Sequence, residues 1–229
     1  MQDKINRYTT DFIACSDKAG QFLFGNHPFV VMENAINPMN LNYSQEKRTM
    51  IREQYHLSEK DLVIGMVGMI TTIKNQVYML DVLNQLDENY KLLIVGDGQK
   101  REEVEEKIQR LGLSNRVMIT GWINNVADYY SAFDVFVMPS LSEGFPLSGL
   151  EAQANGLYTI FSNSVTTSLK LSDKVSFLPI RQEDISLWVN LIKKETENPY
   201  DRKNRVIGTD YDIHENIKKW ERLYQSRKS

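Results

Sequence analysis

The sequence contains few of the features that mark secreted or membrane-spanning proteins. A single cysteine, Cys15, excludes an intrachain disulfide, which is typical of proteins from a reducing compartment. The apolar runs all stay well below the roughly 20 residues of a membrane-spanning helix. The N-terminal residues MQDKINRYTT also lack the apolar segment of a signal peptide. We therefore expect a cytoplasmic protein.

The sequence also lacks an excess of charge of one sign. Lysine and arginine number 27 against 30 aspartates and glutamates, which gives a formal net charge of -3. Such a balance provides no general attraction to nucleic acid or to an anionic bilayer, so we expect no nucleic-acid partner. Hydrophobic residues make up 41% of the chain and charged residues 25%, as in ordinary globular proteins. Any anion site must therefore be local.

Short apolar runs rich in valine and isoleucine alternate with segments of helical period. The runs are PFVVMEN, LVIGMVGM, KLLIVGDG, RVMITGW, VFVMPS and YTIFSN. Because their hydrophobicity is continuous, they predict strands buried on both faces of a sheet. The helical segments cover residues 75–87, 99–113, 126–133 and 146–156. This alternation predicts a doubly wound, Rossmann-like α/β domain with a parallel sheet, from about Phe29 to Glu197.

The two ends of the chain differ from this central pattern. Residues 11–24 predict a strand and a short helix, and residues 210–229 predict a helix whose apolar stripe packs on this domain or on another one. Asp210 and Asp212 form an Asp-x-Asp sequence, but they open this helix. We therefore interpret Asp210 as a helix cap and expect no metal site. The sequence thus divides into residues 1–27, 28–209 and 210–229.

The stretch SEGFPLSGLEAQANG combines a helix start with two carboxylates. Pro146 suits the first helical position and Gly156 the stop after the helix. The free amides of Gly144, Phe145 and the first turn would then form a cradle for phosphate. Since carboxylates repel phosphate, Glu143 and Glu151 are expected to accept hydrogen bonds from hydroxyl groups on either side of it. A sugar and a ribose that flank a diphosphate form a nucleotide sugar.

The spacing Glu143-x7-Glu151, together with GMITTIKN, LLIVGDG and ITGW, resembles the C-terminal, donor-binding half of the GT-B glycosyltransferases of family 4. The likeness is strongest to those that assemble bacterial capsular polysaccharides and exopolysaccharides. It covers nearly the whole chain, and residues 1–27 resemble the segment that joins the two halves. The resemblance implies a retaining transfer of a sugar from a UDP- or GDP-linked donor to a growing polysaccharide or a lipid-linked acceptor, without a metal or another cofactor.

The resemblance also implies roles for individual residues. Glu151 would bind the ribose hydroxyls, and Glu143 would lie near the donor sugar. Lys74 would neutralise the diphosphate and, with Glu143, take part in catalysis. The remaining donor-binding positions would be backbone contacts at Gly68, Ile123, Gly144, Phe145, Pro146 and Leu147, of which Ile123 would meet the base.

Two departures from the family pattern qualify these expectations. Met69 stands where the family has an arginine that neutralises phosphate. This sequence shows no recognisable N-terminal half, which in the family carries the acceptor site. Any peripheral membrane contact would come through that half. We therefore expect a donor-binding domain that is inactive alone. The alternative is a degenerate partner subunit that binds a nucleotide sugar without catalysis. Gly96 and Gly98 also suit a dinucleotide-binding oxidoreductase, but the third glycine of that pattern is missing.

Overall fold

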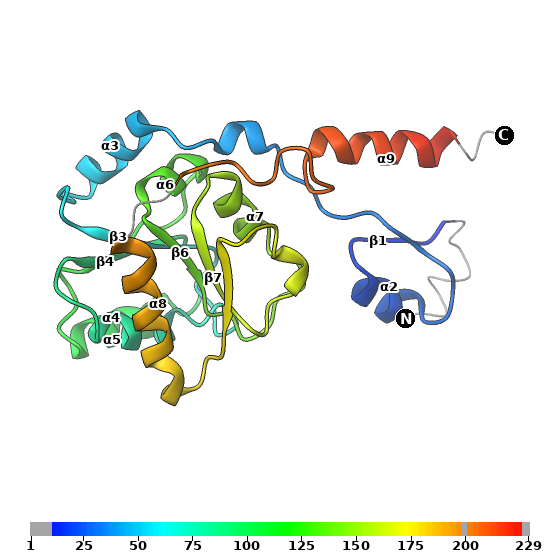
Figure 1. Ribbon diagram of the computed structural model, residues 1–229. Coiled ribbons are helices and arrows are strands. Elements are labelled where there is room, and N and C mark those ends of the chain that lie inside the picture. The colour runs from blue at the N-terminus through cyan, green and yellow to red at the C-terminus, as the bar shows by residue number, and fades with distance from the viewer. Residues whose placement is uncertain (1–10, 198–200, 226–229) are drawn as a thin grey trace. The chain divides into compact units, whose positions relative to one another are not determined.

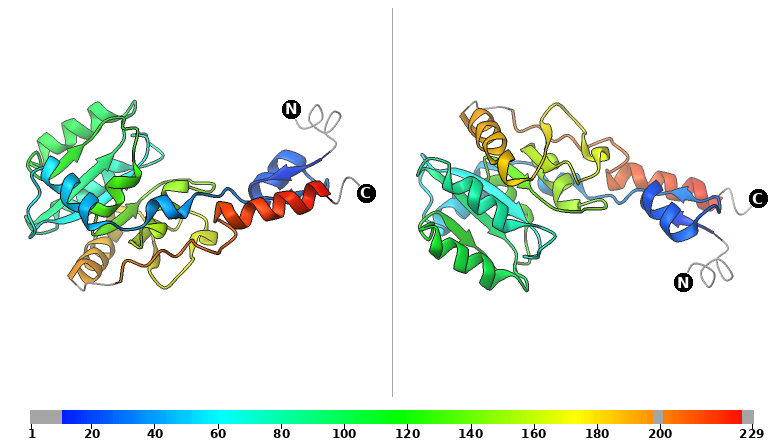
Figure 2. Two further views of the ribbon diagram at one scale, coloured as in Figure 1. Left: turned by 90° about the horizontal axis from the view of Figure 1, so that it is seen from above. Right: turned by 90° about the horizontal axis from the view of Figure 1, so that it is seen from below.

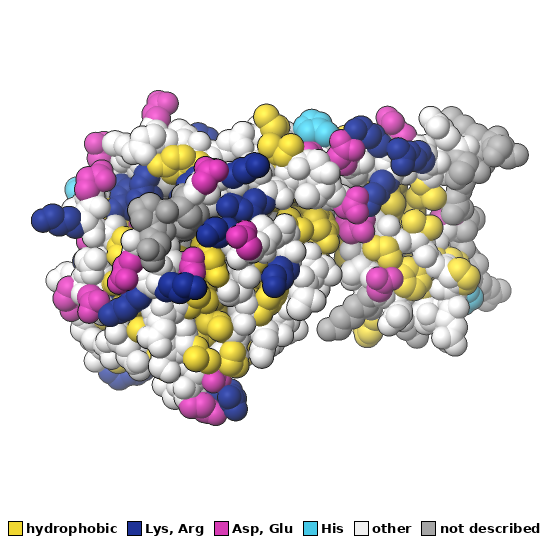
Figure 3. All heavy atoms as spheres, in the orientation of Figure 1, with side chains coloured by type: hydrophobic (Ala, Val, Ile, Leu, Met, Phe, Trp, Pro, Cys, Tyr) yellow, Lys and Arg dark blue, Asp and Glu magenta, His cyan; other side chains and the backbone are white. Residues whose placement is uncertain are grey.

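The computed structural model describes residues 11–197 and 201–225, which form two compact units (Figure 1). The small unit contains residues 11–38 and 206–225, and the sheet unit contains residues 39–197 and 201–205. Within these ranges, every helix is too short or too polar to cross a bilayer. On the face of the sheet unit shown in Figure 3, basic and acidic side chains are interspersed rather than gathered into a patch of one sign.

The sheet unit contains one six-stranded parallel sheet, which confirms the predicted fold class. The strand order is β5-β4-β3-β6-β7-β8. The strands are β3 (Leu62–Val67), β4 (Tyr90–Val95), β5 (Val117–Ile119), β6 (Val135–Met138), β7 (Tyr158–Ser162) and β8 (Val175–Leu178). The central strands β4, β6 and β7 are almost fully buried, because helices cover both faces of the sheet.

Helices cover the sheet in two groups (Figures 1 and 2). On one face lie α4 (Gln76–Asn84), α5 (Arg101–Arg110) and α8 (Ile185–Glu197), which share the largest core cluster with the strands. On the other lie α3 (Gln45–Gln54), α6 (Ala127–Ala132) and α7 (Leu147–Ala154). This second face is closely packed at Gly65, where an added Cβ would lie 2.1 Å from the ring of Phe133.

A partly buried carboxylate fixes α3 to the sheet. Asp134, just before β6, pairs with Arg48 at 2.6 Å and with Arg52 at 3.3 Å, and it accepts a hydrogen bond from the amide of Val63 at 2.7 Å. Arg52 donates further to the carbonyl oxygens of Ser58 and Asp61. These contacts join α3 to the starts of β3 and β6, at the end of the sheet opposite to the carboxyl ends of the strands.

The small unit contains a strand that we predicted in the main sheet. In this unit β2 (Val30–Val31) pairs in parallel with β1 (Ile13–Ala14), and α2 (Asp17–Phe24) connects them. The prediction that PFVVMEN belongs to the doubly wound sheet was therefore wrong. Local hydrophobicity identified a strand, but it does not indicate which strand will pair with it. In the structure Val30 pairs with Ile13 of β1. The strand and short helix predicted for residues 11–24 are confirmed.

The last helix, α9 (Ile213–Gln225), also belongs to the small unit. Its first turn is capped by Asp212, whose Oδ1 accepts a hydrogen bond from the amide of His214 at 3.0 Å. The interpretation of Asp210 as the cap was wrong, because its carboxylate instead pairs with Lys219 at 2.9 Å. The predicted helix is confirmed to Gln225, and residues 226–229 lie outside the described residues.

Candidate functional site

The candidate site lies where the strand order of the sheet reverses. From β3 the chain adds β4 and β5 on one side and then returns to add β6 on the other side of β3. Ligands of open parallel sheets bind beyond the carboxyl ends of the strands at such a point. The two loops that follow β3 and β6 cover residues 68–75 and 139–146, and they hold Gly68, Lys74 and Glu143.

Three polar contacts join these two loops. Lys74 Nζ lies 2.8 Å from Glu143 Oε1, and both side chains are largely buried. The amide of Leu141 donates to the carbonyl oxygen of Ile73 at 2.8 Å. Asn75 has a left-handed backbone with φ 55°, and its Nδ2 donates to the carbonyl oxygen of Pro139 at 3.1 Å. The structure therefore brings the two predicted catalytic residues into direct contact.

Gly68 lets the Lys74 side chain pass over the end of β3. Its φ of 142° favours glycine, and an added Cβ would lie 3.2 Å from Lys74 Cε. A Cβ at Gly96 would in turn lie 2.2 Å from the carbonyl oxygen of Gly68. Close backbone packing therefore accounts for the glycine at position 96 without a dinucleotide.

The N-terminus of α7 opens beside this ion pair. Pro146 has φ -77° and ψ 114° and caps the helix, so the first helical residue is Leu147 and the expectation that Pro146 starts the helix was wrong by one position. Among the described residues, no side chain caps this end. Gly144 and Leu147 are exposed, and apart from the chain neighbours of Gly144 no described atom lies within 4 Å of a Cβ added there. Because the first amides of a helix lack intrahelical acceptors, this end can bind an anion.

Glu151 lies on α7 and contacts a residue that the sequence analysis missed. Its Oε2 accepts a hydrogen bond from the hydroxyl of Tyr130, on α6, at 2.6 Å. Burial raises the pKa of Tyr130 well above its ordinary value, and the neighbouring charge of Glu151 raises it further. In the sequence, Tyr130 belongs to the predicted helical segment VADYYSAF. The pattern there indicated only that Tyr130 is an apolar residue of a helix.

The other predicted positions are less closely connected. Ile123 follows β5 at the sheet edge and, among the described residues, has no hydrogen bond to Lys74, Glu143 or Glu151. Phe145 and Pro146 lie in the turn before α7 as expected. Met69 is 50% exposed, and its carbonyl oxygen accepts a hydrogen bond from Gln76 Nε2. Exposed apolar side chains occur in the loops after β3, β5 and β6 and at the start of α7, at Met69, Ile73, Trp122, Leu141 and Leu147.

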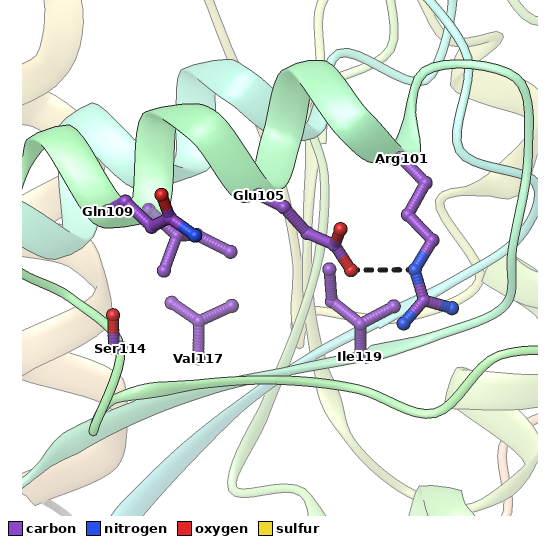
Figure 4. Close-up of a pocket in the computed structure, with 7 residues that line it drawn as sticks. Arg101, Glu105, Gln109, Ser114, Val117 and Ile119 are labelled. Carbon is purple, nitrogen blue, oxygen red and sulfur yellow. Dashed lines mark hydrogen bonds and ion pairs between the residues drawn. The ribbon is translucent and has the colours of Figure 1, made fainter.

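A separate pocket lies between α5 and the edge strand β5 (Figure 4). Its volume is about 250 Å³, and its lining includes Arg101, Glu105, Val117 and Ile119. Arg101 Nε pairs with Glu105 at 2.7 Å along one wall. None of the predicted site residues lines it. Within residues 11–197 and 201–225, no three histidine, cysteine, aspartate or glutamate side chains are grouped as a metal site requires.

Comparison with known protein families identifies the family of this chain. Residues 47–211 match the family described as glycosyl transferases group 1. The chain belongs to this family. The putative glycosyltransferase EpsF of Bacillus subtilis strain 168 is 29% identical over 224 residues, which cover 91% of this chain and 57% of EpsF. The UDP-Gal:alpha-D-GlcNAc-diphosphoundecaprenol alpha-1,3-galactosyltransferase of Escherichia coli is 32% identical over 62% of this chain and 38% of its own length.

Solved structures share the fold of this chain. Anabaena Alr3699/HepE, crystallised with UDP and glucose, superposes with a TM-score of 0.79 at 21% identity and covers 97% of this chain and 65% of its own. A glycosyltransferase from Rickettsia africae ESF-5 has a TM-score of 0.79 at 18% identity. The fold thus matches that of GT-B glycosyltransferases, while this chain spans about half the length of the curated relatives that it matches.

Proposed function

We propose that this chain is the nucleotide-sugar-binding domain of a retaining glycosyltransferase of family 4, the C-terminal half of a GT-B fold. The observation that carries the proposal is the Lys74–Glu143 ion pair beside the open N-terminus of α7, where the strand order reverses. Amides and a lysine provide the positive groups that a diphosphate needs, and two carboxylates provide hydroxyl acceptors. Structures of the same fold hold UDP and UDP-glucose, which supports a UDP-linked donor.

Each residue has a role in this proposal. The amides of residues 144–148 and the ammonium of Lys74 hold the diphosphate and stabilise the charge that develops on it as it leaves. Glu143 accepts hydrogen bonds from the donor sugar, and Glu151 accepts them from the ribose. The turn at Ile123 contacts the base through its backbone. An acceptor domain outside this chain supplies the second substrate, so the chain alone binds the donor without transferring the sugar.

We also propose the wider role. The acceptor is a growing polysaccharide or a lipid-linked saccharide, and the enzyme acts in the cytoplasm in the assembly of a capsular polysaccharide or exopolysaccharide. The names of relatives support this assignment: one acts on a diphosphoundecaprenol-linked sugar, and another belongs to a cps region. Any membrane contact then comes from the acceptor half.

Calorimetric titration of the 229-residue chain with UDP, GDP and ADP tests the proposal. One of the three should bind, and its sugar conjugate should bind in competition with it. Absence of binding by all three at millimolar concentration would contradict the assignment of a donor site.

A second candidate function is a partner subunit that binds a nucleotide sugar without catalysis. The exposed Met69 favours it, because the family arginine at this position would neutralise phosphate. The gene that encodes this chain distinguishes the two functions. A reading frame that continues upstream of Met1 into a second α/β domain supports the enzyme, and a stop codon there supports the subunit.

A further inference from the structure

Packing holds the Tyr130 side chain in one place behind Glu151. The residue is fully buried on α6, with its ring 5.9 Å from that of Phe133 in an edge-to-face contact and 6.0 Å from that of Phe136. Its hydroxyl lies 2.6 Å from Glu151 Oε2 and 3.4 Å from the carbonyl oxygen of Ser148. A ring enclosed in this way cannot turn away, so the core fixes the position of its hydroxyl oxygen, to which Glu151 Oε2 is the nearer of the two acceptors.

The hydrogen bond divides the two oxygens of Glu151 between different tasks. Oε2 accepts the Tyr130 hydroxyl, whereas among the described residues Oε1 has no hydrogen-bond donor. The residue is only partly buried, so it is not enclosed by the core as Tyr130 is. An ionised carboxylate only accepts hydrogen bonds. Oε1 is therefore the oxygen that remains for a ligand hydroxyl.

The proton in this pair belongs to Tyr130. Burial, followed by the negative charge of Glu151, raises the pKa of the phenol well above its ordinary value. The hydroxyl therefore stays protonated at neutral pH and remains a hydrogen-bond donor. Its partner is then held as an acceptor in one orientation before any ligand arrives, which reduces the conformational entropy that binding would cost.

We infer that Tyr130 is a positioning residue that orients the Glu151 carboxylate and thereby sets how strongly the donor site prefers a ribonucleotide to a deoxyribonucleotide. The inference rests on the proposed function, in which Glu151 meets the ribose. Tyr130 itself touches no ligand. It acts only through the carboxylate, so its removal should affect ligands that carry the recognised hydroxyl and spare those that lack it.

The test compares nucleoside diphosphates with and without the ribose hydroxyls. The full 229-residue chain is titrated by calorimetry with UDP, GDP and ADP and with their 2′-deoxy and 3′-deoxy forms. The variants are Tyr130→Phe and, as a matched control, Tyr158→Phe, which removes another buried hydroxyl hydrogen bond, that to Ser176 at 2.8 Å on the strands β7 and β8. Should Tyr130→Phe fail to fold, 3-fluorotyrosine at position 130 keeps the ring and the hydroxyl but changes the strength of the hydrogen bond to Glu151, and it should alter the affinity for the parent nucleotide while sparing the deoxy form.

In the wild-type chain, we expect one deoxy form to bind about tenfold more weakly than its parent nucleotide, the effect of about 1.4 kcal/mol. Tyr130→Phe should weaken the parent nucleotide about fivefold and leave that deoxy form unchanged. Tyr158→Phe should leave the ratio at its wild-type value. Equal weakening of both ligands by Tyr130→Phe would show a merely structural role and overturn the inference, as would unchanged affinity for both.

Failure of the proposed function gives a different result. If the wild-type chain binds none of the nucleotides, the donor site itself is refuted and the inference with it. If the wild-type chain binds them with a preference for ribose that Tyr130→Phe does not alter, the donor site stands and only the role of Tyr130 is refuted.

Discussion

The ammonium of Lys74 and the carboxylate of Glu143 are 2.8 Å apart, although they come from loops that follow different strands. The exposed fractions of the two side chains are 21% and 14%. The lysine assigned to the diphosphate is thus also the partner of the carboxylate assigned to the donor sugar. A diphosphate that binds to Lys74 must therefore share this lysine with the carboxylate of Glu143.

Lys74→Met should weaken binding of the nucleoside diphosphate about 10- to 100-fold. The reason is the loss of a charge-assisted hydrogen bond of about 1.5 to 3 kcal/mol. Lys107→Met is a matched control, because Lys107 pairs with Asp81 at 2.7 Å with a similar exposure on α4 and α5, outside the two loops. Calorimetric affinities that fall equally in both variants would remove Lys74 from the binding site.

Glu143→Gln should affect the binding of two ligands to different extents. It removes a negative charge beside the diphosphate and releases Lys74, so the free nucleoside diphosphate should bind a few-fold more tightly. The nucleotide sugar should gain less or lose affinity, because the carboxylate that accepts its hydroxyl is gone. Competition titrations measure both constants, with Asp81→Asn as the control. An identical change for both ligands would argue against contact between Glu143 and the sugar.

Met69→Arg should strengthen diphosphate binding by about tenfold. Met69 is half exposed at the start of the loop that holds Lys74, and an arginine there would add a cation beside the phosphates. The measurement is the salt dependence of the calorimetric affinity, which should steepen with the added charge. Unchanged affinity would show that another group already neutralises the phosphates.

Asp134→Ala should destabilise the sheet unit by about 3 to 5 kcal/mol, because it leaves the buried Arg52 and the partly buried Arg48 without their carboxylate. Urea unfolding followed by circular dichroism measures this change. Asp87→Ala is the control: Asp87 also pairs with a cation, Lys193 at 2.7 Å, but water screens this exposed pair, so stability should change little. Similar unfolding midpoints for the two variants would contradict the role given to Asp134.

Stability should fall above pH 10, in part through Tyr78. Burial, followed by the charges of Asp184 and Asp81, raises the pKa of Tyr78 to about 12. Between pH 10 and 12 the unfolded chain releases a proton that the folded chain keeps, so this contribution is complete below pH 10 and is lost as the pH rises through that window. In Tyr78→Phe, the urea midpoint should decline less steeply from pH 9 to 11. Parallel declines in the variant and the wild type would contradict the assignment.

Much of the sheet could be predicted because its central strands are continuous apolar runs. The strands β3, β6 and β7 fall within such runs, β4 begins one residue before its run, and α5 and α7 fall within the predicted helical segments. No element was predicted at α3, α8 or β8. The helix α3 is rich in charged residues, and its place is fixed by the distant Asp134. The strand β8 is short and half-buried at the sheet edge.

Part of the candidate site could be predicted, because the sequence motifs pointed to Lys74 and Glu143, which form an ion pair in the structure. A parallel sheet places the carboxyl ends of its strands together, which accounts for the contact between the two loops that hold these residues. Tyr130 was not predictable, because no local pattern distinguishes a buried tyrosine that orients a carboxylate from one that only fills the core. Ile123 and the base contact stay a prediction.

The hydrogen bonds from Leu141 to Ile73 and from Asn75 to Pro139 have a consequence for protein engineering. These hydrogen bonds make the conformation of residues 68–75 depend on that of residues 139–146, and the reverse. A designer who wishes to transplant the carboxylate-bearing loop into a related scaffold has to move the lysine-bearing loop as well, or the grafted segment will lose the template that shapes it.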